Sequence, residues 1–101
     1  MQPHHFGFDW DPAKAAANLA KHKIPFEDAM DVFLDPLALS QPDTDSTTEE
    51  RWVTVGVGRG AKLLLVVHTH LDLEPGRSFV RIISVRKPNN REKRQYEQSA
   101  P

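Results

Sequence analysis

The 101-residue sequence contains no cysteine, which excludes disulfide bonds and thiolate metal sites together. It has no apolar run near the roughly 20 residues that a membrane-spanning helix needs, and its first residues lack the basic-then-apolar order of a signal peptide. We therefore expect a cytoplasmic protein that is stabilised by packing alone. With 39% hydrophobic residues at this length, one core is expected, so we predict a single domain over residues 1–101.

Several enzyme signatures are also missing. The sequence has no Gly-x-Ser-x-Gly nucleophile elbow, no phosphate-binding glycine loop and no His-Glu-x-x-His helix. His68 and His70 stand two residues apart on a predicted strand and would point to one face, but neither a carboxylate nor a third histidine accompanies them at a recognisable spacing. We expect no metal site and no cofactor, and the side chains left for chemistry are Arg, Lys, His, Glu and Tyr.

Charges of both signs are present in nearly equal number but are unevenly distributed. The net charge of −1 argues, taken alone, against a nucleic-acid partner. Eight acids and no Lys or Arg lie between Ile24 and Glu50, whereas residues 76–98 hold seven bases against two acids. Such an asymmetry can place a phosphate-binding surface on a nearly neutral molecule. A solvated face with a basic tail is the alternative.

Two motifs near the N-terminus predict a strand followed by a helix. The aromatic residues at positions 6, 8 and 10 alternate with small or polar residues, which indicates a short edge strand. Asp11 is then a suitable N-cap and Pro12 a suitable first helical residue. The alanine-rich residues that follow favour a helix, and Pro25 ends it.

A second helix is predicted for residues 26–34. Its apolar residues are spaced to lie on one face, at Phe26, Ala29, Met30, Phe33 and Leu34. The Asp-Pro pair at residues 35–36 ends this helix. Residues 37–41 then fit a strand, whereas residues 42–50 are polar and acidic without periodicity and predict an exposed loop.

Strand patterns dominate the second half of the chain. They cover Trp52–Val57, Leu63–Thr69 and Phe79–Val85, and Gly58–Gly60 joins the first two as a hairpin. Because Leu63–Thr69 is apolar on both faces, we expect it at the centre of the sheet. The prediction for residues 71–77, which contain a Pro-Gly pair, is a turn.

The C-terminal residues predict a short charged helix. Asn89 and Glu92 have the spacing of a capping box, and the helix is expected to run to about Gln98. Together these elements predict an α+β fold, in which an antiparallel sheet carries two N-terminal helices packed on it and a short C-terminal helix.

The remaining side chains are sufficient to cleave RNA without a metal. The ribose 2′-hydroxyl is an internal nucleophile held beside the scissile phosphate. The protein then has to supply a base for that hydroxyl, cations around the phosphate in the transition state, and an acid for the leaving 5′-oxygen.

Arg81 is the most informative candidate, because a charge inside the apolar strand Phe79–Val85 is costly unless it reaches water, a carboxylate or a phosphate. A strand arginine paired with an acid is the alternative. Arg86 ends the same strand. Strict alternation places the two arginines on opposite faces, so both serve one site only if the strand ends or bulges between them.

The last helix offers four further candidates. Glu92 is a candidate general base, or simply part of the capping box. Tyr96 is a candidate acid, a base-stacking platform, or the anchor that holds the helix to the sheet. Arg91 and Arg94, three residues apart, are candidates to bind RNA phosphates.

The first helix carries a polar stripe formed by Lys14, Asn18, Lys21 and His22. This stripe could approach RNA phosphates, with His22 as proton carrier, because histidine exchanges protons readily near neutral pH. A solvated helix face explains the stripe equally well.

The order and spacing of several short segments resemble the BrnT family. These segments are Phe8-Asp9-Trp10-Asp11, then Lys14, Asn18 and Lys21-His22, then Phe26-Glu27-Asp28-Ala29, and finally residues 81–87 with Glu92, Arg94 and Tyr96. The similarity spans nearly the whole chain. Lys23 and Pro25 depart from it, since they stand where the family commonly has a C-capping glycine and an N-capping serine, and Val85 stands where alanine is usual.

The resemblance implies a RelE-like fold, toxicity through RNA cleavage, and neutralisation by a small DNA-binding antitoxin of ribbon-helix-helix type. Carried over position by position, it implies the polar site residues Lys21, His22, Arg81, Arg86, Glu92, Arg94 and Tyr96.

Residues and resemblance together favour a metal-independent endoribonuclease toxin of a type II toxin–antitoxin pair. The predicted catalytic residues are Arg81, Arg86, Glu92, Tyr96 and His22, and the predicted RNA-binding residues are Lys14, Lys21, Arg91 and Arg94. We expect the arginines of the final strand and of the helix after it to gather around a single RNA phosphate. The alternative is a non-catalytic binding module that holds an antitoxin or another acidic partner on its basic C-terminal face.

Overall fold

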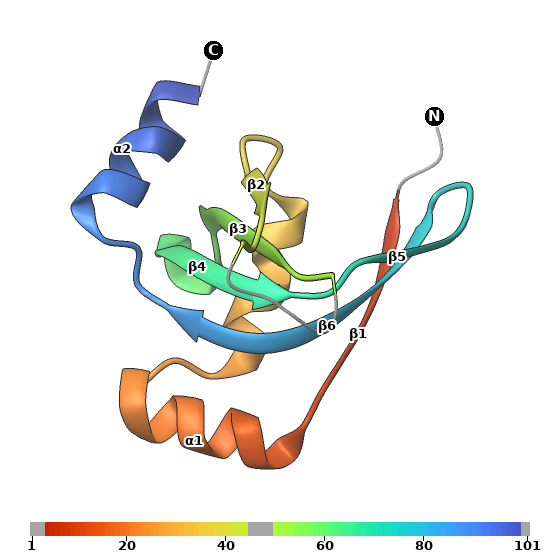
Figure 1. Ribbon diagram of the computed structural model, residues 1–101, viewed down its shortest axis with the longest axis horizontal. Coiled ribbons are helices and arrows are strands. Elements are labelled where there is room, and N and C mark those ends of the chain that lie inside the picture. The colour runs from red at the N-terminus through yellow and green to blue at the C-terminus, as the bar shows by residue number, and fades with distance from the viewer. Residues whose placement is uncertain (1–3, 45–49, 100–101) are drawn as a thin grey trace.

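The computed structural model describes residues 4–44 and 50–99, which form a six-stranded sheet with helical segments around it (Figure 1). In chain order the elements are β1 (His5–Trp10), α1 (Pro12–His22), the 3₁₀ segment η1 (Phe26–Leu34), β2 (Leu39–Pro42), β3 (Trp52–Val57), the short 3₁₀ turn η2 (Arg59–Ala61), β4 (Leu63–His68), β5 (Leu71–Glu74), β6 (Arg77–Arg86) and α2 (Asn90–Ser99). Within this described part, no helix is long and apolar enough to cross a bilayer.

The sheet has the strand order β1-β6-β4-β3-β2, with β5 beside the first half of β6. The central position of β4 and the edge position of β1 are therefore confirmed. The prediction of a wholly antiparallel sheet is wrong, because β1 runs parallel to β6, from His5 opposite Arg77 to Trp10 opposite Ile82. A parallel pair needs a long crossover connection between its strands, and here the chain between β1 and β6 supplies it.

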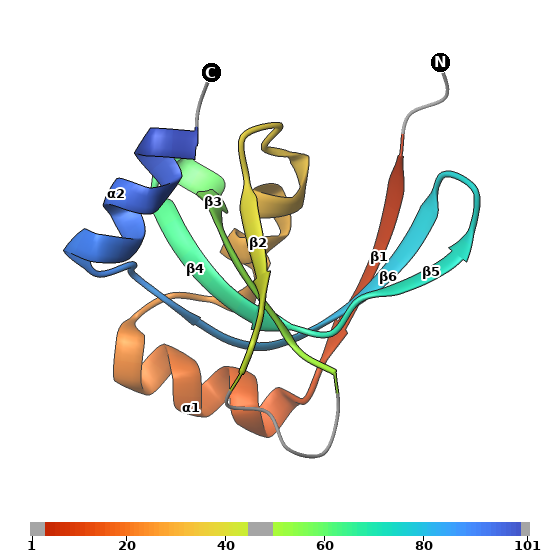
Figure 2. The ribbon, with the colours of Figure 1, turned by 45° about the horizontal axis from the view of Figure 1, so that its top comes forward.

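The predicted turn over residues 71–77 is also wrong, because most of it is the strand β5. This strand pairs antiparallel with β6 as a hairpin, and only Pro75 and Gly76 remain in the turn, with Gly76 at a φ of 82°. The β5–β6 hairpin and α2 lie at opposite ends of the molecule (Figures 1 and 2).

The predicted second helix is a 3₁₀ segment instead of an α-helix. Its buried residues, Phe26, Ala29 and Val32, are spaced by three, which matches the three residues per turn of that helix. Leu34, expected on the buried face, is 69% exposed. Of the predicted acidic loop, Pro42 belongs to β2, and residues 45–49 lie outside the described residues.

One face of the sheet, covered by α1 and η1, carries the hydrophobic core. Its buried members are Ile24, Phe26, Ala29, Val32, Leu64, Val66, Val80, Ile82 and Val85. His68 is buried on the same side, with its ring 4.8 Å from that of Phe33 and Nε2 2.7 Å from the Thr54 hydroxyl. Burial lowers the pKa of His68 to about 4, so it is a neutral core histidine. His70 lies beyond the end of β4 and contacts Asp72 instead.

The N-terminal helix begins as predicted, with the Asp11 carboxylate accepting a hydrogen bond from the Ala13 N–H at 2.9 Å. The polar stripe on this helix is divided, because Asn18 is buried while Lys14 and Lys21 are exposed. The Asn18 amide donates to the Val85 carbonyl at 2.9 Å and accepts from the Val85 N–H at 3.1 Å. The pairing of β6 with β1 stops at Ile82. Beyond that point the Asn18 side chain satisfies the backbone groups of Val85 and so fixes α1 against β6.

Candidate functional site

The face of the sheet opposite the core presents both strand arginines. Val67 pairs with Ser84 and His68 with Ile82, so Ile83 is an extra residue in β6. This bulge reverses the alternation and places Arg81 and Arg86 on the same face, which is the condition that the sequence set. They remain five residues apart, or roughly 16 Å along the strand.

Arg81 makes an exposed ion pair with β1. Its Nη1 lies 3.3 Å from Oδ2 of Asp9, and the two side chains are 52% and 45% exposed. Exposed pairs contribute about 0–1 kcal/mol, so this contact leaves the Arg81 guanidinium free to change partner. The other oxygen of Asp9, Oδ1, is buried without a hydrogen-bond partner among the described residues.

Arg86 is held more firmly, at what we call the β6–α2 corner, formed by Arg86, Asn89 and Glu92. Its Nη1 and Nη2 each donate to one oxygen of Glu92 at 2.8 Å, and Nη1 also donates to the Lys87 carbonyl at 3.2 Å. Glu92 and Asn89 complete the predicted capping box, with both side-chain-to-backbone bonds at 2.8 Å. The Arg86 hydrogen bond lowers the pKa of Glu92, and Glu92 raises that of Arg86.

Tyr96 holds α2 to the rest of the molecule. Its hydroxyl donates to Oδ2 of Asp35 at 2.7 Å, and the Asp35 carboxylate also accepts the backbone N–H groups of Val57 and Leu37, each at 2.9 Å. The bond to the Asp35 carboxylate is the largest influence that raises the pKa of Tyr96, to about 12. A hydroxyl with this pKa is a poor proton donor near neutral pH.

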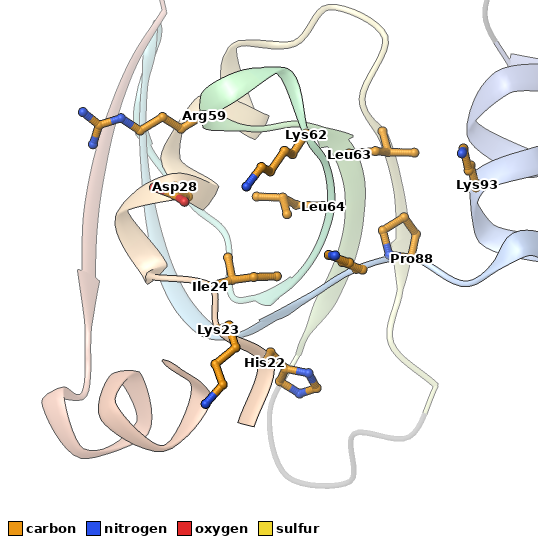
Figure 3. Close-up of a pocket in the computed structure, with 11 residues that line it drawn as sticks. His22, Lys23, Ile24, Asp28, Arg59, Lys62, Leu63, Leu64, Pro88 and Lys93 are labelled. Carbon is orange, nitrogen blue, oxygen red and sulfur yellow. The ribbon is translucent and has the colours of Figure 1, made fainter. Parts of the chain in front are cut away.

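Beside the β6–α2 corner lies a hollow of about 610 Å³ (Figure 3). Its lining, which we call the cationic hollow, comprises His22, Lys23, Ile24, Asp28, Arg59, Lys62, Leu63, Leu64, Lys87, Pro88 and Lys93. The hollow forms because β4 extends past the end of β6, whose last pair is Arg86 with Leu65. Lys62 reaches over Leu64, whereas Arg59 and Lys23 project from the rim (Figure 3).

A close approach of two backbones shapes one wall of the cationic hollow. A Cβ atom on Gly58 would lie 2.7 Å from the carbonyl oxygen of Asp28 and 2.5 Å from a methyl group of Leu64. Only glycine therefore allows η1 to pack against the turn between β3 and β4. This contact brings Asp28 close to the turn that carries Arg59 and Lys62.

The predicted site residues thus fall into separate groups. Arg86 and Glu92 are in contact, Arg81 lies further along the same face, Tyr96 contacts Asp35, and His22 lines the cationic hollow. The four predicted RNA-binding residues, Lys14, Lys21, Arg91 and Arg94, are all exposed, and none makes a side-chain hydrogen bond or ion pair with a described residue. The arginines of β6 and α2 were expected to gather around one point, and the structure instead separates them.

Sequence reasoning missed Lys23, Arg59 and Lys62 as members of a site. No motif joins them, since they come from a helix end and a hairpin turn that are 36 residues apart in sequence at their closest. The sequence marks Lys23 only as a departure from the C-capping glycine that is common in the family. In the structure it has a φ of 62°, the left-handed conformation that favours glycine at a helix C-cap.

Comparison with known proteins supplies one match. Residues 10–92 match a family model described as the ribonuclease toxin BrnT of type II toxin–antitoxin systems. The matched range begins at the last residue of β1 and ends in α2, so it includes His22, Arg81, Arg86 and Glu92 but not Tyr96. A search among curated proteins finds no match.

Proposed function

Because this chain belongs to the BrnT family of ribonuclease toxins of type II toxin–antitoxin systems, we propose that it cleaves RNA without a metal ion, by attack of the ribose 2′-hydroxyl on the adjacent phosphate. The substrate carries its own nucleophile, so the protein has only to position the phosphate, move protons and stabilise the transition state. The 2′-oxygen forms the new bond to phosphorus and the 5′-oxygen leaves. The products are a 2′,3′-cyclic phosphate and a 5′-hydroxyl.

The observation that carries this proposal is the fixed guanidinium of Arg86. Three hydrogen bonds, two to Glu92 and one to the Lys87 carbonyl, hold it at the end of β6. An arginine has five N–H donors, so two remain for a phosphate. Donors that are already oriented need little reorganisation when charge develops on the phosphate oxygens, which is the basis of electrostatic catalysis. In this role Arg86 is the catalytic residue and Glu92 positions it.

Arg81 is assigned to a neighbouring phosphate. The separation of roughly 16 Å along β6 is too large for both arginines to hold one phosphate closely. Its weak surface pair with Asp9 can open at little cost when a phosphate offers a stronger partner.

His22 is the candidate for proton transfer. The two other predicted acid–base residues are less suitable, because the pKa of Tyr96 is raised to about 12 and the Glu92 carboxylate, whose pKa is lowered, is already occupied by Arg86 and the Asn89 N–H. His22 lines the cationic hollow together with Lys87 and Pro88, which directly follow Arg86.

Purified protein incubated with RNA and a chelator tests the reaction. We expect cleavage to persist and the products to carry 2′,3′-cyclic phosphates, while an all-deoxy oligonucleotide stays intact. Arg86→Ala should lower kcat by about 10²–10³-fold, as the loss of an oriented transition-state donor does. Arg77→Gln, which removes the same charge at the opposite end of β6, is the matched control. Cleavage that stops with chelator and returns with added Mg²⁺ would show that the metal-free mechanism is wrong.

Membership of a type II system implies a cognate antitoxin, and we propose that it is a small DNA-binding protein of ribbon-helix-helix type. The reading frame next to the gene tests this directly. A neighbouring product without ribbon-helix-helix character, but able to neutralise the toxin, would contradict the antitoxin type while leaving the ribonuclease assignment in place.

The alternative function, a binding module without activity, has one observation in its favour. Arg81 and Arg86 both have carboxylate partners within the chain, so neither requires a phosphate. Expression without antitoxin separates the two functions. Growth arrest that Arg86→Ala relieves supports the ribonuclease, whereas normal growth with folded protein present supports the binding module.

A further inference from the structure

We propose that the cationic hollow is a second phosphate-binding site, which holds the RNA backbone next to the segment that is cleaved. This inference rests on the proposed ribonuclease function and adds a binding site to it. The residues that carry the site are Lys23, Arg59, Lys62, Lys87 and Lys93, none of which belongs to the proposed catalytic group.

The cations that line the hollow have no partner among the described residues. Of the described residues that line it, five are Lys or Arg, and Asp28 is the one acid. None of the five makes a side-chain hydrogen bond or ion pair with any described residue. Like charges gathered in a concave site repel each other and concentrate positive potential, which an anionic ligand relieves.

The backbone is strained at the edge of the hollow. In the described chain, the two residues other than glycine with a positive φ are Lys23, at 62°, and Ala61, at 61°. Lys23 lines the hollow, and Ala61 lies between its members Arg59 and Lys62. A strained position is retained only where the surroundings impose it, and such positions cluster at ligand sites. Glycine at position 23 would relieve the strain but would remove a cation.

The chemistry of the lining favours RNA over an acidic peptide. The floor, formed by Ile24, Leu63 and Leu64, is apolar, and none of the described residues that line the hollow is Phe, Tyr or Trp. An RNA base therefore has no large aromatic ring to stack on, and the hollow would recognise the sugar-phosphate backbone. The Asp28 carboxylate can accept a hydrogen bond from a ribose 2′-hydroxyl, whereas it repels the carboxylates of an acidic peptide. The volume of the hollow, about 610 Å³, lies within the usual range of ligand sites.

Binding measured apart from cleavage tests the proposal. The Arg86→Ala variant serves as the background, so that a fluorescently labelled 12-nucleotide RNA stays intact during anisotropy titrations at several salt concentrations. Adding Arg59→Gln and Lys62→Gln together should weaken binding by roughly tenfold and lower the slope of log K against log salt by roughly 1.4, for two lost phosphate contacts on a single strand. The control is Arg77→Gln in the same background, which should change the affinity by less than about twofold and leave the salt slope unchanged.

Lys23→Gly provides an independent variant that cannot be dismissed as misfolded. Removing a left-handed lysine at the helix C-cap should raise the Tm by roughly 4–8 °C, while the salt slope falls by roughly 0.7 for one lost phosphate contact. A protein that becomes more stable and binds RNA less well supports the site.

The proposal is overturned if the Arg59/Lys62 double variant and Lys23→Gly both bind RNA with the affinity and salt slope of the background. It is equally overturned if these variants keep RNA binding but lose binding of a poly-glutamate peptide, because the hollow then serves an acidic protein partner. Failure of the ribonuclease function is distinguishable, since it appears as intact RNA in the wild-type reaction while the binding differences remain.

Discussion

The β6–α2 corner and the cationic hollow lie at the same end of the sheet, but the cation at the corner is paired with a carboxylate and the cations of the hollow are not. At the corner, Arg86 meets both oxygens of Glu92, and Asn89 completes the capping box. In the hollow next to it, five cations have no partner among the described residues. Residues 87 and 93 belong to the same short segment as the corner, so one stretch of chain supplies both environments.

This difference separates two uses of a basic residue. A cation that the chain itself neutralises fixes geometry, and its removal is expected to disturb position or orientation. A cation without a partner in a concave site adds repulsion to the folded state, and a ligand from outside the chain would relieve that repulsion. The basic C-terminal segment therefore combines a rigid corner with an open binding surface.

The largest expected effect comes from breaking the element that keeps the two regions together. Asn18→Ala removes the side chain that bonds Val85 on the β6 edge, and leaves a buried N–H and a buried carbonyl without that partner. We expect a loss of about 3 kcal/mol in the free energy of unfolding. Urea denaturation measures it, and a loss under about 1 kcal/mol would mean that α1, with His22, is not fixed by this contact.

His22 and His68 extend the comparison to titratable groups, since one lines the hollow and the other is in the core. Burial lowers the pKa of His68 to about 4 from an ordinary 6.5, so the unfolded chain binds more protons between these values. The stability that neutral His68 contributes is full above pH 6.5 and is lost as the pH falls. By pH 5 the loss should be about 2 kcal/mol.

The control for this pH effect is His68→Gln, which has no titrating group at that position. Its free energy of unfolding should change little between pH 7 and pH 5, although it is lower throughout. Three carboxylates also have lowered pKa values: Asp35, Asp72 and Glu92. Their contributions to stability are lost mainly below their ordinary pKa values near 4, so they add little to the change between pH 7 and pH 5. Parallel pH profiles of the two proteins would contradict the assignment to His68.

These contrasts also explain how much of the molecule could be predicted. The bounds of β3, the N-cap of α1 and the Asn89–Glu92 capping box follow from local patterns, and all three are confirmed. The parallel pairing of β1 with β6 could not be predicted, because it joins segments about 70 residues apart. The same holds for the hollow, whose members come from the end of α1, η1, the turn with η2, β4, the β6–α2 link and α2.

The errors in the first half have a similar origin. The spacing of Phe26 and Ala29 fits both an α-helix and a 3₁₀ helix. Which residue is buried next, Val32 or Leu34, depends on how η1 packs against the sheet, and the structure buries Val32. Arg81 and Arg86 can share one face only if the strand ends or bulges between them, and the bulge at Ile83 meets that condition. The sequence therefore predicted the condition under which the two arginines share a face, but not the distance between them.

Glu92→Gln sharpens the role of the corner. Glutamine keeps the capping box, because its side-chain oxygen can still accept from the Asn89 N–H, but it removes the charge that holds Arg86. We expect a fall of about tenfold in kcat with KM nearly unchanged, since orientation in the transition state is lost while the cation remains. A variant with full kcat would show that Arg86 needs no positioning partner.

Tyr96→Phe gives the smallest effect and tests whether any part of the corner acts by proton transfer. The variant keeps the ring and removes only the hydroxyl that donates to Asp35, so stability should fall by about 1 kcal/mol. The hydroxyl, whose pKa is raised to about 12, stays protonated at neutral pH and is already committed to a carboxylate. If it only anchors α2, kcat at pH 7 should stay within about threefold of wild type, whereas a general acid would cost about 10²-fold or more. A large loss of kcat at unchanged stability would move Tyr96 from the anchor to the reaction, and would require that RNA displaces Asp35 from it.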